Sequence, residues 1–196
     1  KDIHSATAGG QAEYFGLSIS IDTSGNTIAA HAPFFEQGAS NGNLRRGKAE
    51  IFEWNNSQWN QLGNTIYGES PEDQAGSSSF LMYRHRTISM SYTGNRIIVG
   101  AKYNDGSGTD AGHARIYELN NNQWAQLGSD IDGEAADDNF GYAVSINGAG
   151  DQVIIGGPEN MGNSNCSSGN EMGHARVFEG FTPCITNASV INNDPI

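Results

Sequence analysis

One segment of this chain occurs three times. The sequence GKAEIFEWNNSQWNQLG begins at Gly47, GHARIYELNNNQWAQLG begins at Gly112, and a shortened copy, GHARVFEGF, begins at Gly173. Self-similarity of this kind marks stacked supersecondary units, because a single unit cannot bury its apolar face alone. The repeat therefore constrains the fold more than any other feature of the sequence.

Each copy contains short segments in which apolar and polar residues alternate between turn residues, a pattern typical of antiparallel strands. The strands that we expect are, in order, 17–21, 27–30, 49–54, 59–62, 88–91, 97–100, 114–117, 124–127, 143–146, 153–156 and 175–178. No segment has a convincing helical period. The predicted class is therefore all-β, with a four-stranded antiparallel meander in each complete unit.

Units of about sixty residues with four strands each suit the blades of a β-propeller, in which stacking around an axis protects the strand edges. The predicted divisions are 1–13 as the end of a preceding blade and a connection, 14–75 as repeat 1, 76–139 as repeat 2 with a hairpin insertion around Phe80, and 140–196 as an incomplete repeat 3 with a tail. About three blades are expected, as part of a longer propeller or of one assembled from several chains. The last blade lacks a fourth strand, so its open edge is expected to pair with the tail or with another chain.

Short motifs at the strand ends resemble a known family. Phe15-Gly16 and Phe140-Gly141 open a strand, and Val99-Gly100-Ala101 closes the next one, much as in the FG-GAP blades of integrin α-chain propellers. The Trp-x-Gln-Leu-Gly ending is similar to repeats of large secreted bacterial surface proteins. The resemblance implies a propeller fold but no particular function, since propellers include both enzymes and binding modules.

Blades of the integrin type commonly hold calcium between their first two strands, and the resemblance raises that expectation here. The corresponding loops at 22–26, 91–95 and 147–151 are tight turns with at most one or two carboxylates each. Calcium needs several oxygen ligands. We therefore do not carry the family's calcium site over to these loops.

The charge balance excludes one class of partner. The chain has 10 Lys and Arg against 22 Asp and Glu, a formal net charge of −12. Without a basic patch to release phosphate counterions, nucleic acid is not an expected partner. No run approaches the roughly 18 apolar residues of a membrane helix. The sequence starts without a signal peptide, which indicates that one was removed or that a longer precursor precedes it.

Two acidic segments are candidate calcium ligands, and calcium is the only cofactor that the sequence predicts. Asn104, Asp105 and Asp110 concentrate oxygen ligands in a short loop, although Asn, Asp and Gly also make ordinary turns. Asp137 and Asp138 form a second cluster with Glu134. Glu69, Glu72 and Asp73 mirror that cluster one repeat earlier, which favours a structural connection between blades.

Structural roles are predicted for the repeated histidine and tryptophan residues. His113 and His174 are equivalent in successive repeats, where the first repeat has Lys48, so they are expected in separate places rather than in one metal site. Trp59 and Trp124 are also equivalent and are expected to fill space between sheets.

Three aromatic residues are candidates for ligand contact, because repetition does not explain them. They are Phe34 and Phe35, which are expected to be exposed because their loop is otherwise polar, and Trp54, which Leu119 replaces in the next repeat. Cys166 and Cys184 flank the last strand and are either a disulfide or two buried thiols.

The sequence contains no nucleophile elbow, zinc-protease His pair or phosphate loop, so an enzyme is not expected. The predicted function is an extracellular, secreted or cell-surface module of propeller blades for adhesion, recognition or surface assembly. The expected partners are further repeats or copies of itself, and an extracellular protein or glycan. The alternatives are an accessory module that binds or degrades polysaccharide, and a structural subunit of an extracellular fibre.

Overall fold

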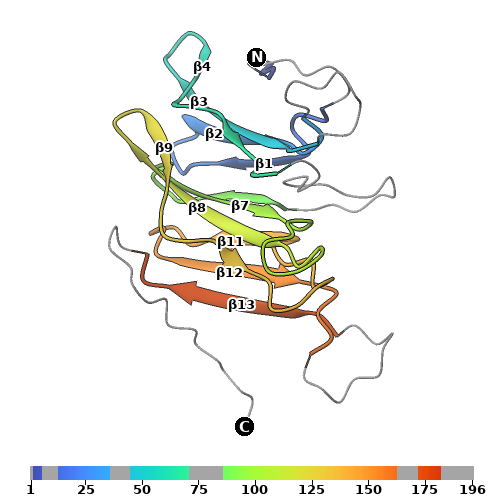
Figure 1. Cartoon of the computed structure of the whole chain (residues 1–196). Helices are drawn as coiled ribbons and strands as arrows, with labels where there is room; N and C mark the ends of the chain where they lie inside the picture. Colours follow the sequence, from blue (N-terminus) through green and yellow to red (C-terminus); the bar gives the residue numbers. More distant parts are fainter. Residues whose placement is uncertain (1, 6–12, 36–44, 71–85, 163–171, 182–196) are drawn as a thin grey trace.

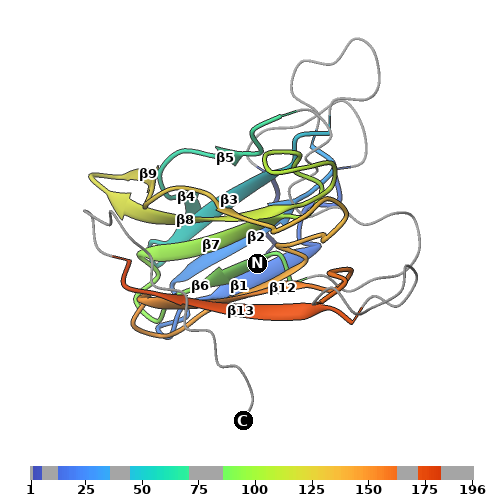
Figure 2. The same ribbon diagram turned by 60° about the horizontal axis from the view of Figure 1, so that its bottom comes forward.

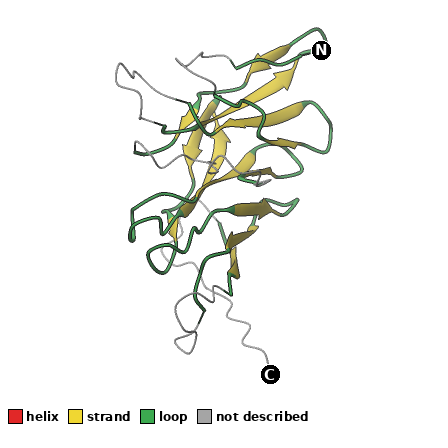
Figure 3. Ribbon diagram, turned by 90° about the vertical axis from the view of Figure 1, so that its right-hand side faces the viewer, coloured by secondary structure: helices red, strands yellow, loops and turns green. Residues whose placement is uncertain are grey.

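The computed structural model of the protein describes residues 2–5, 13–35, 45–70, 86–162 and 172–181. All regular structure in these ranges is β-strand, arranged in three antiparallel sheets (Figure 3). The prediction of an all-β fold is therefore confirmed. Cys166, Cys184, Glu72, Asp73 and the hairpin insertion around Phe80 lie outside the described residues.

Each sheet is built from consecutive strands. Sheet 1 contains β1 (Ser18–Ile21), β2 (Thr27–Ala32), β3 (Lys48–Trp54), β4 (Trp59–Gln61) and β5 (Ile66–Tyr67). Sheet 2 contains β6 (Ile88–Met90), β7 (Arg96–Ala101), β8 (His113–Asn120), β9 (Gln123–Gln126) and β10 (Ile131–Asp132). Sheet 3 contains β11 (Ala143–Ile146), β12 (Gln152–Gly157) and β13 (His174–Glu179).

The expected fourth strand is two short strands. In sheet 1, β4 and β5 both pair with β3, and in sheet 2, β9 and β10 both pair with β8. The break between the two short strands contains Gly63 in sheet 1 and Gly128 in sheet 2, whose φ angles of 74° and 80° are left-handed and incompatible with an extended strand. A simple four-stranded meander is thus the wrong description of the outer edge.

The three sheets lie one after another along the molecule (Figure 1; Figure 2). The buried apolar residues of the described ranges form two clusters, one between each pair of neighbouring sheets. One apolar cluster joins sheets 1 and 2 and includes Ile51 and Ile97. A second cluster joins sheets 2 and 3 and includes Ile98, Ile155 and Phe178. Sheet 2 is therefore apolar on both faces, which explains why its strands contain long apolar runs.

Polar contacts at equivalent positions also connect neighbouring sheets. The Ser20 hydroxyl of sheet 1 accepts a hydrogen bond from the Met90 amide of sheet 2 at 3.1 Å. One repeat later, the Ser89 hydroxyl accepts from the Ile146 amide of sheet 3 at 3.2 Å. Buried strand-edge amides need such partners, because an unpaired amide away from water is costly.

Two glycines of the recognised motifs allow the backbones of sheets 2 and 3 to approach each other. A Cβ atom on Gly100 would lie 2.1 Å from the Gly141 carbonyl oxygen, and one on Gly141 would lie 2.1 Å from the His113 oxygen. No side chain fits at such distances. Glycine is therefore required at both positions by sheet stacking.

Among the residues that the structure describes, no helix is long and apolar enough to cross a membrane.

Candidate functional site

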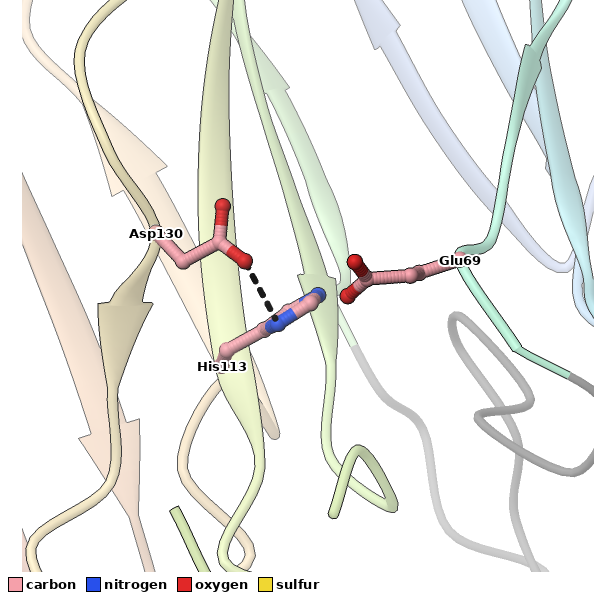
Figure 4. A group of neighbouring side chains, drawn as sticks. All are labelled: Glu69, His113 and Asp130. Carbon is pink, nitrogen blue, oxygen red and sulfur yellow. Dashed lines mark ion pairs between the residues drawn. The ribbon is translucent and has the colours of Figure 1, made fainter. Parts of the chain in front are cut away.

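A cluster of charged side chains lies between sheets 1 and 2 (Figure 4). β8 begins with His113 and places Arg115 on the same face two residues later. Asp130 precedes β10, the short strand that pairs with the start of β8. Glu69 follows β5 of the preceding sheet. Stacking of the two sheets therefore brings together residues from three distant parts of the chain.

Glu69, His113 and Asp130 are close enough to be tested as a metal site. One ligand atom from each lies within 4.8 Å of the others, and this is the only such group of at least three residues in the described parts of the chain. Burial, and then the Arg115 charge, lower the pKa of His113 to about 4, so its imidazole is neutral at pH 7. A neutral imidazole with two carboxylates is a donor set that divalent metals accept.

Arg115 already occupies the space between these carboxylates. Its guanidinium donates to both oxygens of Asp130, at 2.8 and 2.6 Å, and to Glu69 at 2.6 Å. The hydrogen bond from Arg115 is the largest cause that lowers the pKa of Asp130. A metal ion would have to displace this guanidinium, so the cluster is best explained as an ion-pair network whose cation is Arg115.

The same arrangement recurs between sheets 2 and 3. Arg176 and His174, the equivalents of Arg115 and His113, lie 3.6 and 3.8 Å from oxygens of Glu134. Glu134 follows β10 as Glu69 follows β5. Recurrence at both sheet contacts favours a structural role, and it places the two histidines in separate networks.

In sheet 1, Lys48 takes the position of these histidines. Its ammonium lies 3.0 Å from Glu13 and 3.7 Å from Glu50. It also lies 4.1 Å from the centre of the Phe35 ring. A buried charge needs such compensation, because removal from water is costly.

A small cavity adjoins the network. It is lined by residues that include His31, Lys48, Tyr67 and His113. Its volume, counted as the space that the centre of a water molecule can occupy, is about 10 Å³. That volume suits about one water molecule and no larger ligand. Among the described residues, His31 Nε2 has no hydrogen-bond partner, whereas its Nδ1 lies 2.8 Å from the Thr87 hydroxyl of the next sheet.

The two predicted calcium segments lie close together, but several of their oxygens serve turns. Asn104 Oδ1 accepts from the Gly106 amide, and Asp105 Oδ1 accepts from the Asp110 amide. Asp138 is buried and accepts two backbone amides, from Glu134 and Ala135. These hydrogen bonds agree with the interpretation that Asn and Asp in these segments form turns.

Asp110 remains in an acidic surrounding. Its pKa is raised, first by burial and then by the charges of Asp105 and Asp137. The three carboxylates do not form a group as tight as that at His113. Calcium at this place stays a prediction.

The candidate aromatic contacts differ in exposure. Phe35 is 5% exposed and packs on Tyr67 at 5.6 Å, so the expected exposed contact is wrong for this residue. Phe34 is half-buried, between Tyr14 at 5.2 Å and the Arg45 guanidinium at 5.1 Å.

Trp54 and Trp59 are both half-buried and pair across the β3–β4 hairpin, with ring centres 5.4 Å apart. Trp124, by contrast, is 4% exposed and donates from Nε1 to the Leu62 oxygen of sheet 1. The expectation that a repeated tryptophan fills the space between sheets is therefore confirmed for Trp124.

Sequence reasoning missed the importance of His31, Arg115 and Asp130. A signal existed for His31, since it interrupts the apolar run of β2 at the position where β7 has Gly100. Arg115 and Arg176 are equivalent in the repeat, but their acidic partners lie on other strands. Only the stacking of sheets identifies those partners.

Replacing Arg115 with Met is expected to lower the free energy of unfolding by about 1–3 kcal/mol, because two carboxylates lose charged hydrogen bonds. Arg115→Lys should recover only part, since a lysine cannot donate from two nitrogens to one carboxylate. Glu69→Gln is the control, and its half-exposed side chain predicts a loss under about 1 kcal/mol. Urea unfolding at pH 7 measures all three. Equal stability of Arg115→Met and the parent would contradict the assigned role.

No family model matches the chain, and no curated protein matches it. Among solved structures, it is similar to the Kuenenia stuttgartiensis hydrazine synthase, with a TM-score of 0.41 and 13% identity over 82% of this chain and 37% of that one. It is also similar to the tricorn protease, with a TM-score of 0.44 and 6% identity over 83% of this chain and 13% of that one. The chain thus spans less than half of either structure. Similarity this low gives no information about the activity of this chain.

Proposed function

We propose that this chain is a non-catalytic module of β-propeller blades of the FG-GAP type, which serves recognition or surface assembly outside the cell. The observation that carries the proposal is the repetition of the contacts between sheets. The same serine hydroxyls, arginine–glutamate pairs and apolar rows join sheet 1 to sheet 2 and sheet 2 to sheet 3. Contacts of this kind are expected of blades whose main task is to stack.

The chemistry of the described side chains supports a role without catalysis. Among the described residues, Glu69, His113 and Asp130 form the one group of three metal-ligating side chains, and Arg115 neutralises its carboxylates. The adjoining cavity has room for about one water molecule, which is too little for a substrate. A placement outside the cell is proposed from the resemblance to secreted repeat proteins and from the net charge of −12.

A second candidate is glycan binding by the same module. The paired rings of Trp54 and Trp59 support it, because both are only half-buried and lie at a hairpin. An aromatic face of this kind packs against the apolar face of a sugar while its indole nitrogen can donate a hydrogen bond.

One experiment tests both candidates. The purified chain is run in gels that contain soluble polysaccharides, with and without added calcium, and the release of reducing ends is measured in parallel. We expect no release of reducing ends. Release that follows the protein through purification, and that an inactive preparation lacks, would overturn the non-catalytic proposal.

Variants decide whether the Trp54–Trp59 pair binds the glycan. Retardation that is lost in Trp54→Ala but kept in Tyr92→Ala, a change at another exposed aromatic residue, would favour the glycan candidate. Retardation that is equal in both variants would contradict it.

A further inference from the structure

The outward face of sheet 3 carries residue types that sheets 1 and 2 bury. A row across sheet 3 runs through Ser145, Ile154 and Val177, which are cross-strand neighbours. The equivalent rows, which contact the next sheet, are Ser20, Ala29 and Ile51 in sheet 1 and Ser89, Ile98 and Ile116 in sheet 2.

Exposure separates the last row from its equivalents. Ile98 and Ile116 of sheet 2 are 0% and 1% exposed, whereas Ile154 and Val177 are 44% and 39% exposed. Two apolar β-branched residues side by side on a strand face normally pack against a partner. The row on sheet 3 therefore has the residue types of a contact between sheets, although its apolar side chains are exposed.

Sheet 1 presents the complementary face at the other end of the described structure. Ile19 and Ile21 of β1 are 72% and 60% exposed. Their equivalents are Ile88 and Met90 in sheet 2 and Val144 and Ile146 in sheet 3, which are all no more than 7% exposed because each pair packs on the preceding sheet.

The polar contacts show how the two faces would fit. Besides the serine–amide bonds, the Thr23 amide donates to the Tyr92 oxygen at 3.1 Å, and the Tyr92 amide donates to the Gly148 oxygen at 3.0 Å. These residues are equivalent in the first turn of each sheet. Each sheet thus offers a serine hydroxyl and a turn amide to the next one.

We propose that the outward face of sheet 3 binds the outward face of sheet 1 in a second copy of this chain, head to tail. The Ser145 hydroxyl then accepts from the Ile21 amide, the Gly148 amide donates to the Thr23 oxygen, and Ile154 packs against the exposed isoleucines of β1. The contact repeats, for a third time, the geometry that the chain already contains twice. This inference rests on the proposed role as stacking blades.

Phe15 does not obstruct such docking. It packs edge-on against Phe52 of sheet 1 at 6.1 Å, as Phe140 packs against Phe178 of sheet 3 at 6.3 Å. Phe140 belongs to the apolar cluster between sheets 2 and 3, so an aromatic residue at this position is compatible with close stacking of two sheets. The equivalent aromatic pair on sheet 1 therefore leaves room for a neighbour.

The test uses complementary variants of the whole chain in sedimentation velocity over a range of concentrations. Ile154→Arg disables the sheet 3 face, and Ile19→Arg disables the sheet 1 face; both residues are exposed, so the fold should tolerate either change. We expect the parent to associate, and more strongly as salt screens its negative charge. Each variant alone should be monomeric. An equimolar mixture should form dimers, because it still contains one intact face of each kind.

Met161→Arg, at an exposed residue in the loop after β12, is the control and should associate like the parent. Circular dichroism must show the same β structure in all variants. A parent that stays monomeric at its highest soluble concentration overturns the docking inference. So does association that either face variant leaves unchanged, or a mixture that stays monomeric. The polysaccharide assay is read on the monomeric variants, so a catalytic result there would overturn the proposed function independently of self-association.

Discussion

Gly141→Ala is expected to lower the free energy of unfolding by roughly 3–5 kcal/mol, a loss that few single methyl groups cause. Gly141 has a φ of 90°, which alanine adopts only with strain. The added Cβ would also lie 2.1 Å from the His113 oxygen and 3.2 Å from the Ala101 nitrogen, both in sheet 2. Since hydrogen bonds hold these backbone atoms in their sheet, they cannot move individually, and sheets 2 and 3 would have to separate.

Gly16 is the matched control within the same chain. It has a φ of 89° and the same place before the first strand of its sheet, but an added Cβ meets no atom within 4 Å. Gly16→Ala should therefore cost the monomer only the conformational strain, about 1–2 kcal/mol. Urea unfolding of the two variants measures the difference. Equal losses would show that φ, and not the close approach of the sheets, accounts for glycine at this position.

The second large effect concerns acid. Lowering the pH from 7 to 5 is expected to reduce the free energy of unfolding by about 4 kcal/mol through His31 and His113 together. Burial lowers the pKa of His31 to about 3, and burial together with Arg115 lowers that of His113 to about 4, against an ordinary value of 6.5. At pH 5 the unfolded chain binds a proton at each residue, while the folded chain does not.

The direction of the change follows from which state takes up protons. Both pKa values are lower in the folded protein, so the two histidines carry almost no penalty above pH 6.5 and oppose folding more and more as the pH falls from 6.5 toward their folded pKa values of about 3 and about 4. Asp130 and Glu118 also have lowered pKa values, because hydrogen bonds from Arg115 and Arg96 favour their charged forms. Their stabilisation is lost only at lower pH, so it does not obscure the window between 6.5 and 5.

Variants isolate the histidine contribution. His31→Asn keeps a polar atom near the Thr87 hydroxyl but does not titrate, so its loss between pH 7 and 5 should be about 2 kcal/mol instead of 4. His4→Asn, at an exposed histidine, should behave like the parent. Urea unfolding at four pH values measures each curve. The same pH dependence in His31→Asn and the parent would show that His31 takes up its proton in the folded state.

The sequence alone predicted strand positions well where the side-chain period was clear. The alternation from Ala143 to Ile146 and the apolar run after Gly150 correspond to β11 and to most of β12. The split of the outer strand was not foreseen. The residue pattern around Gly63 and Gly128 does not distinguish a continuous strand from an interrupted one, because the φ angles of these glycines cannot be read from the sequence.

Sites were harder to predict than strands for a physical reason. Asn104, Asp105 and Asp138 have the residue types of calcium ligands, but the backbone amides that use their oxygens cannot be counted before the chain is folded. Phe35 was expected to be exposed because its neighbours in sequence are polar. Its burial depends on Tyr67 of β5 and Lys48 of β3, which approach it from two other strands.

The sequence by itself determined the class of structure, the order of the repeats and the presence of glycine at the motif positions, since all three depend on local conformation and on self-similarity along the chain. Tertiary structure decided which face of each sheet is buried, why Gly100 and Gly141 must lack side chains, and which carboxylates Arg115 holds. These properties arise between sheets, from atoms that are far apart in sequence, and the distances that create them exist only once the sheets are stacked.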